Sequence, residues 1–174
     1  MTFTVAPTIE TERLILRDYK ELDFEPFADF CASERSAGVG GPTTRAEAWR
    51  GMAMMIGHWH LRGYGMWWLE EKSTGRAVGR AGLWFPEGWP AKELGWVIYD
   101  QFEGKGMAYE AAMAARNYAY DNLGWKTLIS LISKDNLRSI ALAERMKAHL
   151  DGTWTSPTGN VALIYHHPIP GELA

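Results

Sequence analysis

Cysteine is nearly missing from this sequence, because Cys31 is the only one among 174 residues. A lone cysteine excludes an internal disulfide and any metal site built from several thiolates. Such low cysteine usage fits a reducing compartment, so we expect a cytoplasmic protein. The histidines predict no metal site either. His58 and His60 are two residues apart on an expected helix, and His166 and His167 are adjacent on an expected strand, so the members of each pair face different ways.

Long apolar runs and an excess of basic residues are also missing. No run approaches the roughly 20 apolar residues that span a bilayer, and residues 1–7 lack the basic-then-apolar order of a signal peptide. Lysine and arginine number 18 against 21 acidic residues, which gives a net charge of −3 and argues against a nucleic-acid-binding protein. We therefore expect no membrane partner and no nucleic-acid partner.

What is present is the composition of a globular protein, with 47% hydrophobic and 22% charged residues. The length suits one domain over residues 1–174 with a core of its own. Nine tryptophans are unusual. Most of them suit core packing and several suit a pocket or a subunit contact, which leaves a homodimer open.

Capping residues and apolar periodicity predict the helices, the first of which covers residues 23–32. Thr44 and Glu47 form a capping box that opens a helix ending near Gly63. One side of this helix carries Trp49, Met52, Ala53, Ile56 and His60. The helix after Gly106 carries a small-residue face for close packing on a sheet, made of Ala108, Ala111, Ala112, Ala115 and Ala119. Asn136 caps a further helix that runs to about Lys147.

Alternating apolar and polar residues predict the strands, which we place at 12–18, 65–71, 77–85, 93–99, 126–133, 153–155 and 161–167. The strands at 93–99 and 126–133 flank a helix, and a strand–helix–strand order gives a parallel crossover. The sequence therefore predicts an α/β (α+β) fold. Its mixed, largely antiparallel sheet has about seven strands, with helices on both faces.

The most informative segment is Gln101-Phe-Glu-Gly104-Lys-Gly106, where an apolar strand ends and an alanine-rich helix begins. Such a junction leaves backbone N–H groups without an internal partner at the positive end of a helix dipole. Glycines let the main chain approach an anion closely. The segment therefore predicts a phosphate or pyrophosphate site.

The two common phosphate motifs, G-x-G-x-x-G at a first strand and G-x-x-x-x-G-K-[ST], are absent. The segment instead resembles the Q/R-x-x-G-x-G/A acyl-CoA motif of the GNAT superfamily of N-acetyltransferases. The fuller string at 104–111, followed by Asp135-Asn-Leu-Arg-Ser139 and Ala143-Glu-Arg-Met146, is similar to the RimJ/RimL-type branch. The resemblance covers about residues 12–165. It implies the GNAT fold, in which a central parallel pair of strands splays apart.

The resemblance implies acetyl-CoA as the cofactor. Loop amides would hold its pyrophosphate, by position those of Phe102, Glu103, Gly104, Lys105, Gly106, Met107 and Ala108. The backbone of Val97, Ile98 and Tyr99 would pair with the pantetheine arm, and an exposed N–H there would polarise the acetyl carbonyl. Asn136 would hydrogen-bond the pantetheine from the neighbouring helix.

The reaction that the resemblance implies is the attack of an amine on a thioester. The resemblance offers one candidate for the general base and one for the group beside the leaving sulfur. Glu93 matches the general-base glutamate of other branches by its offset from the motif. A solvated strand-end carboxylate, with ordered water as the base, is the alternative. Several branches place a proton-donating tyrosine where this chain has Ala143. Ser139 matches the N-x-x-S of the RimJ/RimL-type branch and would sit by the sulfur, or as a first-turn residue it would bond the helix backbone.

Two departures from the family pattern bear on these expectations. Glu103 puts a negative charge beside an anion site, where it either points to solvent or weakens cofactor binding. Lys147 stands in place of a helix-ending glycine, so that terminus is expected to lack its left-handed cap residue.

These residues together predict an N-acetyltransferase that moves acetyl from acetyl-CoA directly to a primary amine. The acceptor is either a protein or peptide N-terminus or a small molecule, and a fold does not choose between them. A non-catalytic acyl-CoA-binding or sensor module is the alternative, because the tyrosine is missing and Glu103 is unusual.

Overall fold

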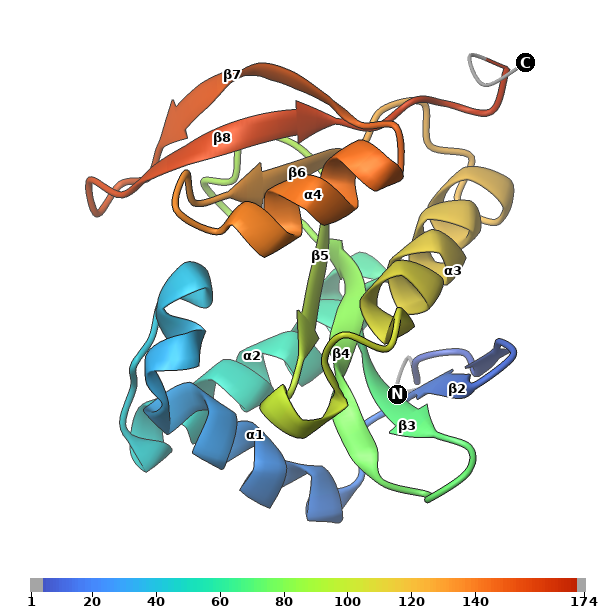
Figure 1. Ribbon diagram of the computed structural model, residues 1–174, viewed down its shortest axis with the longest axis vertical. Helices are drawn as coiled ribbons and strands as arrows, with labels where there is room; N and C mark the ends of the chain where they lie inside the picture. Colours follow the sequence, from blue (N-terminus) through green and yellow to red (C-terminus); the bar gives the residue numbers. More distant parts are fainter. Residues whose placement is uncertain (1–4, 172–174) are drawn as a thin grey trace.

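The computed structural model describes residues 5–171, so the expectation for the first residues of the chain falls largely outside it. Within that range a sheet of eight strands (Figure 1) has the order β1-β2-β3-β4-β5-β6-β8-β7. Neighbouring strands are antiparallel except β5 and β6, which are parallel, so the mixed sheet is confirmed. The strands are β1 (Ile9–Glu10), β2 (Leu14–Arg17), β3 (Met66–Glu71), β4 (Ala77–Trp84), β5 (Glu93–Ile98), β6 (Ile129–Ile132), β7 (His149–Thr155) and β8 (Val161–His166). The two residues of β1 are too few to alternate, so the sequence does not predict this strand.

Helices cover both faces of the sheet, as predicted. Trp67 packs in one core cluster with α3 (Met107–Asp121), and the adjacent Trp68 packs in another with α1 (Phe24–Ala32) and α2 (Arg45–Arg62). The fourth helix, α4 (Leu137–Arg145), lies on β6. The remaining elements are the 3-10 turns η1 (Glu21–Asp23), η2 (Glu34–Val39) and η3 (Asp100–Phe102). In Figure 1, η2 in light blue rises from the end of α1 toward the start of α4.

Between residues 5 and 171, no helix has the combination of length and apolar character that crossing a membrane requires.

Alanines set the distance between α3 and the sheet. Ala111, Ala112, Ala115 and Ala119 are fully buried, and Ala108 in the first turn is partly buried. Small side chains let a helix approach its neighbour closely, which confirms the small-residue face as a packing surface. This close packing holds the start of α3 beside the end of β5, where the twin-glycine loop lies.

The buried face of α2 differs from the predicted apolar side. The capping box and the end at Gly63 are confirmed. However, Trp49 is 61% exposed and Ile56 is 38% exposed. The residues that α2 buries are Ala48, Met52, Met55, His58 and Trp59. Apolar residues occur around most of this helix, so its periodicity does not choose between two faces that differ by a small rotation.

The end of α4 has the left-handed cap residue that it was expected to lack. Lys147 itself has a φ of 66°. Its N–H donates to the carbonyl of Glu144 at 2.8 Å, and the N–H of Ala148 donates to the carbonyl of Ala143 at 2.9 Å. These two bonds form a Schellman motif. The helix therefore ends in the usual way, but with a residue whose Cβ makes the left-handed conformation costly.

Lys147→Gly is expected to raise the free energy of unfolding by about 0.5–1 kcal/mol, because glycine adopts this conformation without the Cβ clash. Urea titration measures the change. Arg145→Gly, in the last turn of the same helix, is the matched control and should lower the free energy of unfolding by about 1 kcal/mol. Destabilisation by both substitutions would show that the Lys147 side chain, rather than its backbone conformation, matters at this position.

Candidate functional site

Strands β5 and β6 separate immediately after they meet. Their parallel ladder consists of a single residue pair, Glu93 with Ile129. Beyond this pair, hydrogen bonds that involve side chains replace the backbone-to-backbone bonds of the ladder. The Leu131 N–H donates to the Glu93 carboxylate at 3.3 Å, and the Ser130 hydroxyl donates to the Leu94 carbonyl at 2.6 Å. In Figure 1, β6, β7, β8 and α4 accordingly lie apart from β2, β3 and β4, with β5 between the two groups.

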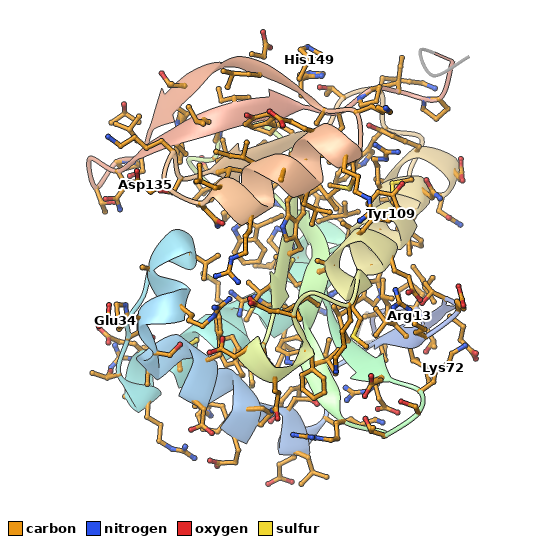
Figure 2. The ribbon with its side chains drawn as sticks, viewed as in Figure 1. Arg13, Glu34, Lys72, Tyr109, Asp135 and His149 are labelled. Atoms are coloured by element: carbon orange, nitrogen blue, oxygen red, sulfur yellow. The ribbon has the colours of Figure 1, made fainter. Side chains whose placement is uncertain are left out.

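A cleft of about 1170 Å³ occupies the separation and is bounded by β5, the loop after it, the starts of α3 and α4, and η2. Figure 2 shows Glu34 of η2 and Asp135 before α4, which both line the cleft, on opposite sides of its opening. The volume exceeds the ~300–1,000 Å³ of ordinary small-molecule sites, so the cleft suits a ligand of nucleotide size or more. The predicted residues that line it are Val97, Ile98, Phe102, Glu103, Gly104, Gly106, Met107, Ala108, Asn136 and Ser139.

Three predicted residues do not line this cleft. The N–H of Tyr99 donates to the Val78 carbonyl of β4 at 2.9 Å, and its side chain is buried. The ammonium group of Lys105 lies 5.5 Å from the centre of the Phe102 ring. Glu93 stands where the two strands part.

The backbone groups that β5 offers to the cleft belong to Trp96 and Ile98. Val97 pairs with β4, and the Tyr99 N–H is bonded to Val78, so the backbones of Val97 and Tyr99 face β4. Because this direction alternates along a strand, the N–H groups of Trp96 and Ile98 face the separated β6. The register between β4 and β5 decides which residues of β5 turn their N–H groups toward β4 and which toward β6. The sequence does not reveal this register. Trp96, which lines the cleft, is therefore absent from the predicted set.

The twin-glycine loop exposes its amides at the edge of the cleft. Gly104 and Gly106 have φ values of 71° and 78°, a region that favours glycine. A Cβ on Gly106 would lie 3.3 Å from the Arg13 guanidinium, whereas a Cβ on Gly104 would meet no atom within 4 Å. The N–H groups of residues 104–109 make no hydrogen bond to any residue in the range 5–171. Together with the positive end of α3, they form an edge rich in donors that suits an anion.

Arg13 holds this loop in place, and Figure 2 shows it beside the start of α3. Its Nη1 donates to the Lys105 carbonyl at 2.5 Å, and its Nε donates to the Glu110 carboxylate at 2.7 Å. The Thr11 hydroxyl donates to the same carboxylate at 2.6 Å. The segment before β2 is thereby tied to the loop and to the first turn of α3. Arg13 and Lys105 are 92 residues apart, so no local pattern marks this contact.

Glu93 is the titratable group at the point of separation. Its Oε2 accepts the indole N–H of Trp89 at 2.6 Å, and its Oε1 accepts the Leu131 amide. Burial raises the pKa of Glu93 to about 7, although both hydrogen bonds act to lower it. The Trp89 ring packs against Trp154 of β7 with 5.2 Å between the ring centres. A carboxylate that is half ionised near neutral pH has the pKa that suits a general base.

His167 fixes the orientation of Ser130. The Ser130 hydroxyl donates to Leu94, so its other contact, 2.9 Å from His167 Nε2, is a bond that the histidine donates. The proton of the neutral ring is therefore on Nε2. Burial, followed by the charges of Arg116 and His166, lowers the pKa of His167 to about 3. His167 stays neutral at physiological pH and keeps Ser130 turned toward Leu94.

Asn136 and Ser139 stand at the start of α4. Asn136 Oδ1 accepts the Ser139 N–H at 3.2 Å, which confirms the predicted cap. The Asn136 amide nitrogen lies near Gly38 of η2, where an added Cβ would be 3.0 Å away. The Ser139 hydroxyl bonds no residue in the part of the chain that the structure describes, so the bond to the helix backbone is not seen there. Both side chains line the cleft with polar groups that remain available.

Glu103 does not point to open solvent. Its carboxylate forms ion pairs with Arg35 of η2 and with Arg138 of α4, and its side chain is 27% exposed. Arg35 also pairs with Asp100. Arg35, Glu103 and Arg138 all line the cleft. The sequence contains no motif that marks Arg35. Arg35 reaches Glu103 only because the folded chain places η2 at the cleft, next to this loop.

A separated parallel pair of strands with free amides beside it defines the fold of the GNAT acetyltransferases. Residues 13–149 match the family model described as an acetyltransferase (GNAT) domain, and this chain belongs to that family. The family consists of acyltransferases that use acetyl-CoA.

A crystal structure of an acetyltransferase from Agrobacterium tumefaciens str. C58 resembles this chain with a TM-score of 0.87, at 38% identity over 97% of each chain. An uncharacterized protein, YkkB of Bacillus subtilis (strain 168), is 32% identical over 111 residues. That match spans 58% of this chain and 64% of the length of YkkB. RimL, a ribosomal L7/L12 alpha-N-protein acetyltransferase solved in complex with coenzyme A, has a TM-score of 0.75 at 18% identity over 94% of this chain and 98% of that chain. The likeness to RimL supports the fold alone.

The residues of the cleft fit acetyl-CoA. The donor edge at 104–109 suits a diphosphate. The free N–H groups of Trp96 and Ile98 suit an extended arm that contains amides, and the volume suits a ligand larger than a single nucleotide. No acidic side chain faces the cleft from this loop without a cationic partner, because Glu103 is paired with two arginines within the described residues.

Proposed function

We propose that this protein transfers the acetyl group of acetyl-CoA directly to a primary amine within a ternary complex. One observation carries the proposal, namely the arrangement along β5. Glu93, with a pKa of about 7, stands at the end where β5 and β6 meet, and the free amides of residues 104–109 stand beyond the end where they are apart. Glu93 does not line the cleft itself, but it stands where the two strands part, and the anion site lies beyond the far end of β5. A base and an anion site separated along one strand suit a long phosphorylated carrier whose reactive end meets an amine.

Each residue has a role in this proposal. Acetyl-CoA would supply an acyl group activated as a thioester, and its diphosphate is assigned to the free amides of residues 104–109. The amides of Phe102 and Glu103, which the sequence predicts as ligands, do not take part, because they donate to the carbonyls of Tyr99 and Asp100. Glu93 accepts the proton that the amine loses. The N–H groups of Trp96 and Ile98 are placed to donate to a pantetheine amide or to the acyl oxygen. The Ser139 hydroxyl is free to donate or orient a proton on the α4 side of the cleft.

We propose a protein or peptide α-amine as the acceptor, following the resemblance to the RimJ/RimL-type branch, with a small-molecule amine as the second candidate. Tryptophans surround Glu93. Trp84 is its cross-strand neighbour on β4, Trp89 bonds it, and Trp154 packs on Trp89. All three are partly exposed. These rings favour an acceptor with an apolar or aromatic group next to the amine, and their faces attract an approaching ammonium.

The test is incubation with acetyl-CoA and a panel of amines, with the release of free thiol and the mass of the acceptor both measured. The panel contains peptides with free and blocked N-termini, aromatic amines, polyamines and amino acids. Thiol release that depends on the amine, with a gain of one acetyl group on the acceptor, supports the enzyme. Tight CoA binding without turnover across the panel supports the alternative, an acyl-CoA-binding or sensor module.

Ser130→Ala is expected to lower kcat about tenfold with a smaller effect on the KM for acetyl-CoA. Alanine leaves the Leu94 carbonyl without its donor at the point where the strands part, so β6 shifts there or admits water. The point of separation is next to Glu93 and far from the twin-glycine loop, which is why kcat should change more than KM. Steady-state kinetics and the free energy of unfolding, expected to fall by about 1–2 kcal/mol, measure the two consequences.

Ser130→Thr is the control, because threonine keeps the hydroxyl that donates to Leu94. It should recover most of kcat. Equal losses in the alanine and threonine variants would assign the effect to packing around residue 130 instead of to the hydrogen bond.

A further inference from the structure

Glu103 lies next to the amides that the proposed function assigns to a diphosphate, yet it is itself an anion. The free N–H groups begin at the next residue, Gly104, and both residues line the cleft. A diphosphate on these amides would place like charges close to the Glu103 carboxylate, and repulsion of this kind costs binding energy. The negative charge of Glu103 must therefore be balanced by groups of this chain.

Two arginines balance it, and they come from opposite sides of the cleft. Arg35 belongs to η2 and Arg138 to the first turn of α4, and the carboxylate of Glu103 bridges them. Asp100 also pairs with Arg35, so the group contains two cations and two anions. Guanidinium groups bind carboxylates and phosphates with the same planar fork of donors. Both arginines can therefore exchange one anion for the other.

We propose that Arg35 and Arg138 are phosphate ligands for the cofactor and that Glu103 is the internal anion that holds them in the free protein. This inference rests on the proposed function. When the cofactor binds, the two guanidinium groups exchange the Glu103 carboxylate for phosphate oxygens, and the carboxylate turns to solvent. A carrier without phosphates leaves Glu103 in place, so the exchange selects acetyl-CoA over a bare pantetheine thioester.

Calorimetric titration of Glu103→Gln with CoA and with pantetheine tests the proposal. Glutamine frees both arginines, so we expect CoA to bind about five- to tenfold more tightly at low ionic strength, with the gain shrinking at high salt. The affinity for pantetheine, measured by displacement, should not change, because pantetheine has no phosphate. Arg138→Gln should weaken CoA binding about tenfold. In that background Glu103→Gln should give a smaller gain than in the wild type, because only Arg35 remains to be freed.

Glu25→Gln is the matched control, because it removes the same unit of negative charge from an exposed ion pair with Arg45 on α1 and α2. Its affinity for CoA should equal that of the wild type. If Glu103→Gln binds CoA no more tightly than the wild type, or gains equally for pantetheine, Glu103 is not a substitute for phosphate and the inference is wrong. If the wild type binds no CoA at all, the proposed function fails first, so the two failures are distinguishable.

Discussion

Gly104→Val is expected to raise the Kd for CoA at least about 100-fold, which corresponds to a loss of roughly 2.7 kcal/mol of binding free energy. Gly104 has a φ of 71°, and a left-handed conformation costs a residue with a Cβ about 1–2 kcal/mol. A β-branched side chain either accepts that strain or moves the loop. In both cases the amides that follow lose the positions that let them converge on one anion. Calorimetric titration with CoA measures the loss.

Gly75→Val is the matched control for this prediction. Gly75 lies in the turn between β3 and β4, has a φ of 67°, and like Gly104 would place a Cβ where no atom lies within 4 Å. Its valine variant therefore has the same backbone strain away from the cleft. We expect similar losses of stability in the two variants and a change in Kd only for Gly104→Val. Undiminished CoA affinity in Gly104→Val would contradict the assignment of the diphosphate to this loop.

Local signals in the sequence predict most of the fold because each depends on residues within one turn or one strand. The cap at Asn136 and the capping box at Thr44 are confirmed by hydrogen bonds that span three residues. The alanines of α3 are close in sequence and share one face, so their burial follows from helical geometry alone. The parallel crossover follows from the order of strand, helix and strand.

The parts of the site that the sequence does not predict depend on contacts between distant segments. Trp96 faces the cleft because of the register of β5 with β4, and Arg13 reaches the loop from before β2. Arg35 pairs with Glu103 because the chain brings η2 to the side of the cleft opposite α4. Ser130 donates to Leu94 because the ladder between β5 and β6 ends there. Each residue type is common on protein surfaces or in strands, so it has no signal of its own. Lys147 shows the converse, because the backbone keeps a left-handed cap even where the residue does not favour it.

Glu93→Gln is expected to lower kcat about 100-fold above pH 7 and to change the shape of the pH–rate profile. In the wild type, Glu93 gains its proton as the pH falls through about 7 and can no longer accept one from the amine, so kcat falls on the acid side. Glutamine accepts no proton at any pH, so this limb disappears. The difference between the two proteins should therefore be largest above pH 7 and smallest well below it.

The acceptor amine also loses activity when it is protonated, and two acceptors with different amine pKa values separate the two effects. The limb that belongs to Glu93 stays at the same pH with both acceptors, whereas the limb that belongs to the amine moves with its pKa. If the limb near pH 7 survives in Glu93→Gln with both acceptors, Glu93 is not the base, and ordered water takes that role.

Stability gives a second readout of the same group. The folded pKa of about 7 lies above the ordinary glutamate pKa of 4.5, so the unfolded chain releases this proton first as the pH rises. The contribution of Glu93 to stability is full below pH 4.5, declines as the pH rises and is lost by about pH 7. The free energy of unfolding of the wild type, relative to Glu93→Gln, should therefore fall by up to about 3 kcal/mol between pH 4 and pH 8. A relative stability that does not vary with pH would show that burial does not perturb this carboxylate, and a general base near neutral pH would then have to be sought elsewhere.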